Sequence, residues 1–128
     1  MEVIKMLDVK DSLDRLEWTA EHHFLHIQNH HEFMRAWAIQ FELAYTDFRT
    51  IQMVLQIDGS YHELLANFTA QYDKVYAYEY EFAAGGLDGF YAKYHEASDL
   101  ESYQKAQESL REYISDIRGI MEQSLTEE

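Results

Sequence analysis

The stretch VYAYEYEF, residues 75–82, decides the fold because it can be interpreted either as a β-strand or as part of a helix. Its aromatic residues alternate with small or acidic ones, as in a half-buried strand. A strand needs a partner for its backbone N–H and C=O groups, and no second segment has strand character. The apolar positions that lead into it, from Tyr61 to Val75, have helical spacing. We therefore predict that residues 75–82 are helical.

The rest of the chain also favours helices. Proline is absent and only five glycines occur in 128 residues, so the usual turn residues of a β protein are missing. Apolar residues recur at steps of three and four, and Asn29 with Glu32 has the spacing of a helix-capping box. The sequence predicts an all-α, single-domain protein over 1–128, an antiparallel four-helix bundle with a short extra helix between the third and fourth long helices. The expected helices lie near 9–28, 32–57, 61–83, 87–96 (the short one) and 99–124.

The charge of the chain restricts its partners. It has 24 acidic and 10 basic residues, a formal net charge of −14, and no two basic residues are adjacent. Such a field repels nucleic acid and anionic lipid and attracts basic protein surfaces. We expect a basic protein partner, with no direct nucleic-acid binding and no membrane association.

Cysteine is absent, which excludes disulfides and thiol chemistry. The first residues, MEVIKMLDVKDSLD, contain no apolar run of signal-peptide length. We expect a cytoplasmic protein.

Histidines are concentrated in EHHFLHIQNHHE, residues 21–32, which holds five of the seven in the chain. In a continuous helix His22, His26 and His30 align, and imidazoles four residues apart can share a metal ion. A dinuclear site in a helical bundle also needs inward carboxylates, commonly in Glu-x-x-His pairs, and no such pair occurs. We expect no bound metal and no cofactor, with His23 or His30 beside the core. The alternative is a metal-binding bundle that uses the His22–His31 cluster and Glu79, with His23, His26, His30 and Glu79 as the candidate ligands.

Glu79 falls near the middle of the apolar stripe of the third helix. A carboxylate in that position must be hydrogen-bonded, paired or protonated. A histidine of the first helix or a tyrosine hydroxyl is the expected partner. Because no nucleophile or phosphate-binding loop accompanies it, we interpret Glu79 as structural and predict that the protein is not an enzyme.

Tyrosine is abundant, with ten residues, more than the predicted core stripes use. Tyrosine is favoured at interfaces because it gives rigid, amphipathic contact area. The predicted partner-binding residues are Tyr78, Tyr80, Glu81, Tyr91 and Tyr94. Two alternatives are that these tyrosines cover the edges of an aromatic core, or that they form a homodimer seam.

The sequence thus predicts a non-enzymatic, acidic protein-binding module. Small acidic proteins of this kind often act as inhibitors. The expected type is an immunity protein or a phage antagonist of host defence, with nucleic-acid mimicry as one subset.

Overall fold

A computed structural model describes residues 9–34, 37–57 and 59–126, with side chains up to residue 123. Every secondary-structure element in these ranges is helical, and they contain no strand. The elements are α1 (Lys10–Gln28), α2 (Trp37–Ile57), the 3-10 turn η1 (Gly59–Tyr61), α3 (His62–Lys93) and α4 (Ala97–Thr126). Residues 75–82 lie inside α3, which confirms that this stretch is helix.

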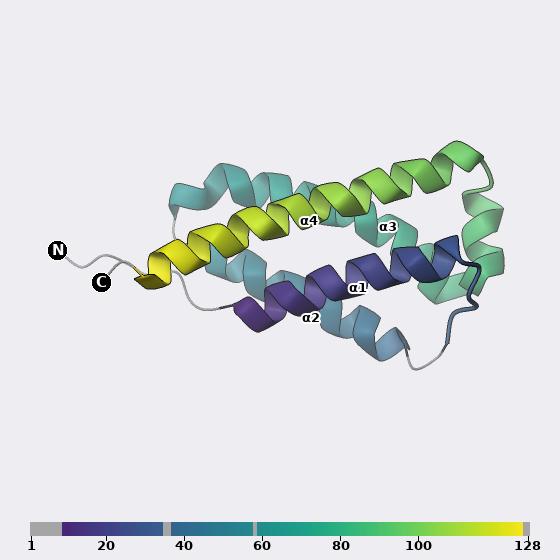
Figure 1. The fold of residues 1–128 in the computed structure, drawn as a ribbon, viewed down its shortest axis with the longest axis horizontal. Coiled ribbons are helices and arrows are strands. Elements are labelled where there is room, and N and C mark those ends of the chain that lie inside the picture. The colour runs from purple at the N-terminus through teal and green to yellow at the C-terminus, as the bar shows by residue number, and fades with distance from the viewer. Residues whose placement is uncertain (1–8, 35–36, 58, 127–128) are drawn as a thin grey trace.

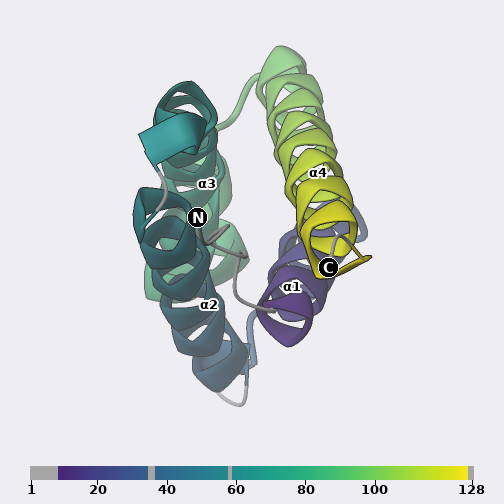
Figure 2. The same ribbon diagram turned by 90° about the vertical axis from the view of Figure 1, so that its left-hand side faces the viewer.

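The four α-helices lie side by side along one long axis (Figure 1). Viewed end-on they occupy four corners, with α2 diagonally across from α4 (Figure 2). Each of the neighbouring pairs α1–α2, α2–α3, α3–α4 and α4–α1 is in contact, and α1 also reaches α3. No contact joins α2 to α4 among the described residues, so these two helices present their outer sides in opposite directions.

The core forms where the apolar stripes of the helices meet. Aromatic rings dominate α3 and the side of α2 that faces it; Phe48 and Tyr72 stack with ring centroids 3.9 Å apart. Burying each such side chain contributes about 1.5–3 kcal/mol relative to leaving it exposed. The largest fully buried side chains are Leu13, Leu16, Ile27, Ile51, Leu55, Phe68, Phe82, Phe90, Tyr103, Leu110, Ile114 and Ile117.

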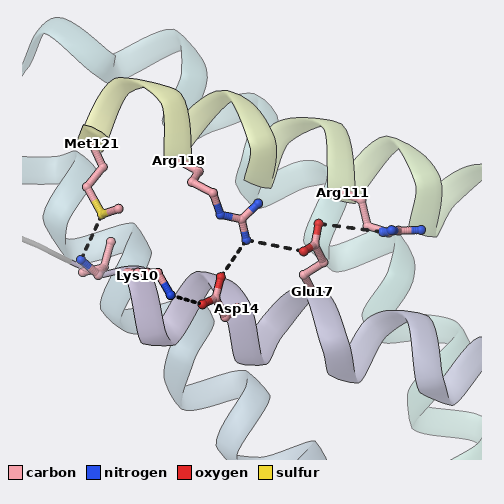
Figure 3. Close-up of polar contacts among 7 residues, drawn as sticks. Lys10, Asp14, Glu17, Arg111, Arg118 and Met121 are labelled. Atoms are coloured by element: carbon pink, nitrogen blue, oxygen red, sulfur yellow. Dashed lines mark hydrogen bonds and ion pairs between the residues drawn. The ribbon is translucent and has the colours of Figure 1, made fainter. Parts of the chain in front are cut away.

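Ion pairs join α1 to α4 along one edge of this core (Figure 3). Arg118 donates to Asp14 at 3.0 Å and to Glu17 at 3.4 Å, and Lys10 pairs with Asp14 at 2.8 Å. Arg111 lies 3.9 Å from the second oxygen of Glu17. Because these side chains are partly exposed, water and salt screen the pairs, and their main effect is to align the two helices.

The end of α3 differs from its prediction. The sequence indicated that a helix ends near residue 83 and that a separate short one spans 87–96. Instead α3 runs to Lys93, and only Gly86 inside it leaves helical geometry, with φ 65° and ψ −160°. The chain changes direction there, so the last part of α3 crosses the end of the molecule (Figure 1).

Glu32 explains why the kink lies at Gly86. Its Oε1 accepts hydrogen bonds from the backbone N–H of Leu87 at 3.0 Å and of Phe33 at 3.1 Å. It also lies so close to Gly86 that a Cβ there would collide with it. The prediction that Glu32 starts a helix over 32–57 is wrong, since residues 32–34 are not helical and α2 is described from Trp37. Helices α1 and α4 match their predicted ranges, 9–28 and 99–124, to within two residues.

Candidate functional site

A buried ion pair joins α1 to α3. His23 Nδ1 and the Glu79 carboxylate are in direct contact, and both side chains are about 5% exposed or less. The sequence predicted a helix-1 histidine or a tyrosine hydroxyl as the partner of Glu79, and the structure shows the histidine. Both groups lie among aromatic rings, with Phe82 6.4 Å and Phe41 5.9 Å from the imidazole, so each depends on the other for a polar contact.

Two polar atoms at or near this pair are buried without a partner in the described part of the chain. The Tyr103 hydroxyl and His23 Nε2 have no hydrogen-bond partner among the described residues. Burial raises the pKa of the Tyr103 hydroxyl well above its usual value, and the negative charge of Glu79 raises it further. The same two causes, burial first, raise the pKa of Tyr72. Three grooves on the described part of the molecule are lined by other residues, and neither His23 nor Glu79 lines any of these three.

The remaining histidines of residues 22–31 disperse. Helix α1 ends at Gln28, so His30 is not in line with His22 and His26 as a continuous helix would place it. His22 stacks on Trp18, His26 stacks on Trp37, and His30 adopts φ 58° and lies exposed. Of the two histidines expected beside the core, only His23 is buried.

Of the four candidate metal ligands, only His23 and Glu79 are brought together, and His26 and His30 lie apart from them. His26 Nδ1 lies 3.1 Å from His31 Nδ1, and His23 is occupied by Glu79. Within the described ranges no group of three or more His, Asp or Glu side chains could hold a metal ion. The geometry gives the metal-binding alternative no ligand set.

The predicted partner-binding residues are divided over three places. Tyr78 stacks on Tyr103 at 4.6 Å and contacts Tyr94 at 4.7 Å, on the α4 side of α3. Tyr80 lies on the opposite flank, 51% exposed and beside Tyr76.

The other two predicted residues are held within the molecule. Tyr91 donates a hydrogen bond to the carbonyl of Ile27 at 2.9 Å, and Glu81 pairs with Lys93 at 3.2 Å. Burial raises the pKa of both Tyr78 and Tyr91. Three of the four tyrosines thus cover the edges of the core, the alternative interpretation considered above, and the five residues do not form one continuous surface.

A groove between α3 and α4 contains Tyr78 and Tyr94. It has a volume of about 540 Å³. Lys74 and Lys105 also line it, so the groove itself is not acidic.

Four exposed acidic side chains share the outward side of α4. We call Glu101, Glu108, Glu112 and Asp116 the α4 outer face; all four are exposed. They lie about 180° from the buried stripe that contains Tyr103, Leu110, Ile114 and Ile117. None of the four forms an ion pair among the described residues, and Lys105 is the one cation between them.

The sequence did not predict two features of α2. Asp47 is buried at its flank, where Arg15 of α1 donates two hydrogen bonds to it at 2.8 and 3.0 Å. A second apolar stripe on α2 faces outward rather than into the core. We call Ile39, Leu43, Thr46, Thr50, Met53 and Ile57 the α2 outer face. Its four large apolar side chains are 49–65% exposed. Their helical spacing is present in the sequence, but another stripe with more aromatic and aliphatic residues, through Phe41, Phe48 and Leu55, runs along the same helix and was the one assigned to the core.

We found no family model, curated protein or solved structure that matches this chain. Among the described helices, none combines the length and the apolar composition needed to cross a membrane.

Proposed function

We propose that the protein is a non-enzymatic binding module that inhibits or antagonises a basic protein. One observation supports this most directly: the acids of the α4 outer face are exposed and have no ion-pair partner among the described residues. Added to a net charge of −14, they create a field that steers a basic partner toward this side of the molecule.

We place the partner across the α4 outer face, with Tyr78 and Tyr94 at its edge. Both tyrosines line the neighbouring groove and are already held by ring contacts, so they lose little entropy on binding. Tyr80 and Tyr91 lie elsewhere, and we give them no central part in the contact. Glu81 lies near Tyr94, since Lys93 pairs with Glu81 and stands 5.7 Å from the Tyr94 ring centroid, but that ion pair already occupies its carboxylate. In this proposal the four helices form an antiparallel bundle, and the part of α3 after Gly86 is its short extra helix.

The expected setting is the cytoplasm, and the expected type is an immunity protein or a phage antagonist of host defence. In either case the partner is an enzyme with a basic surface, and an acidic helix that blocks a nucleic-acid site is one way to inhibit it.

Affinity capture with two matched baits tests the proposal. The test bait carries Glu112→Lys and Asp116→Lys on the α4 outer face. The control bait carries Asp73→Lys and Asp88→Lys, two exposed acids of α3, and therefore has the same net charge. Mass spectrometry should identify a basic protein held by the wild type and by the control but lost from the test bait.

Binding kinetics with the captured partner then distinguish attraction by the acidic side chains from contact with Tyr94. The association rate should fall as salt rises, because charges on a partly exposed surface are screened beyond about 10 Å at 0.1 M salt. Tyr94→Ala should instead raise the dissociation rate. Equal loss of binding in both baits would show that net charge alone attracts the partner and would contradict the placement on α4. A partner that is not basic would contradict the proposed function itself.

A further inference from the structure

The α2 outer face has the residue spacing of a helix that packs against another helix. Its residues follow one another at steps of four, three, four, three and four, the 3.5-residue repeat that lets two helices pack along their length. Leu43, Met53 and Ile57 are 49%, 58% and 60% exposed, and Ile39 is 65% exposed. A continuous apolar line of this length on a helix surface marks an interaction site.

The two threonines in the middle of the line do not interrupt it. Thr46 donates its hydroxyl hydrogen to the carbonyl of Glu42 at 3.2 Å, and Thr50 donates to the carbonyl of Thr46 at 3.0 Å. Because both hydroxyls are bonded to their own helix, the methyl groups are free to pack against a neighbour.

The residue types of the α2 outer face also follow the same order from either end. Isoleucine stands at both ends, Leu43 and Met53 come next, and the two threonines lie at the centre. In an antiparallel pair of these helices, each residue would therefore meet a residue of like size. A two-fold interface requires this property, since one patch must complement itself.

The charge distribution also favours a second copy of this chain as the occupant of the α2 outer face. Any second copy also carries a net charge of −14, so it can approach only where charge is balanced. Beside the α2 outer face, Glu42 and Arg49 offset each other, and Asp47 is neutralised by Arg15. The acidic α4 outer face lies at the diagonally opposite corner (Figure 2), so it stays farthest from the partner copy.

We propose that a second copy of this chain docks antiparallel on the α2 outer face and forms a two-fold dimer. Ile39 meets Ile57 of the other copy, Leu43 meets Met53, and Thr46 meets Thr50. Leu43 also borders a hollow of about 390 Å³ between α1 and α2 that includes Trp18, so the flexible Met53 of the other copy fills it.

The size of the contact sets its strength. The line is about 27 Å long and about as wide as a helix, about 10–12 Å. With Trp18 at its edge, the two copies together bury on the order of 1,000 Å², which is near the lower bound for a specific interface. The dimer should therefore be weak and reversible, with its concentration dependence visible in solution.

Sedimentation equilibrium of the full chain over a concentration series tests this. The protein should pass from monomer to dimer, and the dimer should become tighter as salt rises from about 0.05 M to about 0.5 M, because salt screens the repulsion between two acidic molecules. A chain that stays monomeric across the series at high salt overturns the proposal. A dimer that weakens with salt also overturns it, since its contact would then be charged.

Single substitutions locate the contact. Leu43→Glu and, separately, Met53→Glu should each weaken dimerisation at least tenfold. Ser115→Glu, an exposed position on α4, adds the same charge and should leave it within about twofold. Circular dichroism checks that each variant folds, and the two test positions give independent readings. Equal weakening by Ser115→Glu overturns the placement on α2. So does a monomeric chain in which Leu43→Glu abolishes binding of a different protein.

Cross-linking tests the direction of the pairing, because the chain has no cysteine of its own. Under mild oxidation, Ile39→Cys chains mixed with Ile57→Cys chains should form disulfide-linked heterodimers. Ile39→Cys alone should not, since an antiparallel pair places the two copies of residue 39 about 27 Å apart. Efficient cross-linking of Ile39→Cys to itself overturns the antiparallel register.

Discussion

Gly86 is the residue at which the path of the chain depends on a missing side chain. Its φ of 65° lies in the left-handed region, and the Glu32 carboxylate occupies the space where a Cβ would stand. Glycine alone meets both conditions at low cost. The neighbouring Gly85 is helical and has nothing within 4 Å of an added Cβ, so it is a matched control.

We expect Gly86→Ala to lower the free energy of unfolding by about 1–3 kcal/mol, because it adds backbone strain and displaces Glu32. Gly85→Ala should raise it by up to about 1 kcal/mol, since alanine favours helix more than glycine does. Urea unfolding followed by circular dichroism measures both. Similar effects at the two positions would mean that the kink at Gly86 is not required.

The His23–Glu79 pair gives a second prediction for single residues. Glu79→Leu should lower the free energy of unfolding by about 3 kcal/mol or more, because it leaves a buried imidazole without its partner. Glu81→Leu, two residues away on the half-exposed side, should change it by less than about 1 kcal/mol. Urea unfolding again gives the values.

The double variant His23→Phe with Glu79→Leu shows whether the two groups act as a unit. It should be more stable than Glu79→Leu alone, because no polar group is then left unpaired in the core. Simple addition of the two single effects would contradict the coupling.

For individual residues, the sequence predicted the side-chain partner of a buried charge better than it predicted which exposed residues form one surface. The position of Glu79 in an apolar stripe required a partner, and a histidine of the first helix supplies it. The buried Asp47 could not be predicted in this way, because it lies at the flank of its helix and only the neighbouring α1 encloses it. The five proposed partner-binding residues are close in sequence but do not share one surface, because helical geometry sends Tyr78 and Tyr80 to opposite flanks.

The three- and four-residue spacing of apolar residues predicted the buried stripes of the helices well. It predicted less well where the helices begin and end. The start of α2 was misplaced because Glu32 has the spacing of a capping residue but binds the distant backbone of Leu87 instead. Such a contact between a loop and a distant helix leaves no local signal in the sequence. The α2 outer face was missed for another reason, since a helix with two apolar stripes does not show which of them is covered.

The junction between α1 and α2 should be sensitive to acid. His26 stacks on Trp37 there, and burial lowers the pKa of His26 below its ordinary 6.5, as do the nearby His31, His23 and His22. The unfolded chain therefore binds a proton at a higher pH than the folded chain does. The contribution of His26 to stability is complete above that ordinary pKa and is lost as the pH falls through the lowered one.

We expect the unfolding midpoint of the wild type to fall between about pH 7.5 and about pH 5. His26→Phe keeps the ring stacked on Trp37 but cannot take up a proton, so its midpoint should fall less. Urea unfolding across this pH range measures both proteins. Parallel curves would show that His26 does not couple protonation to folding.

The aromatic core as a whole should limit stability at high pH. Burial, and then the charge of Glu79, raises the pKa of Tyr72 and Tyr103 above the ordinary 10.0. The unfolded chain releases these protons first, so stability is complete below the ordinary pKa and is lost as the pH rises above it. Phenolate absorbance should therefore rise in two stages, with the second stage coinciding with loss of the helical signal.

Tyr103→Phe checks that prediction, because it removes a buried hydroxyl that has no partner among the described residues. The variant should be about 1 kcal/mol more stable at neutral pH and should unfold at a higher pH than the wild type. A less stable variant would indicate that this hydroxyl is satisfied.

The diagonal placement of α2 and α4 leads to a prediction about the whole molecule. If a second copy docks on the α2 outer face and a basic protein on the α4 outer face, the two events use surfaces that do not touch (Figure 2). They should then be independent, so that Leu43→Glu abolishes the dimer while the affinity for the basic partner changes by less than about twofold. Glu112→Lys with Asp116→Lys should do the reverse, and should tighten the dimer slightly because it reduces the repulsion between copies.

Salt separates the two events further, since rising salt should weaken the charged contact on α4 and strengthen the apolar contact on α2. Analytical ultracentrifugation of the chain alone and with its partner, at low and high salt, measures both equilibria in one experiment. A dimer that forms only when the partner is bound would contradict independence. It would mean that the partner promotes dimerisation, as it would if it neutralised the negative charge through which two copies repel each other.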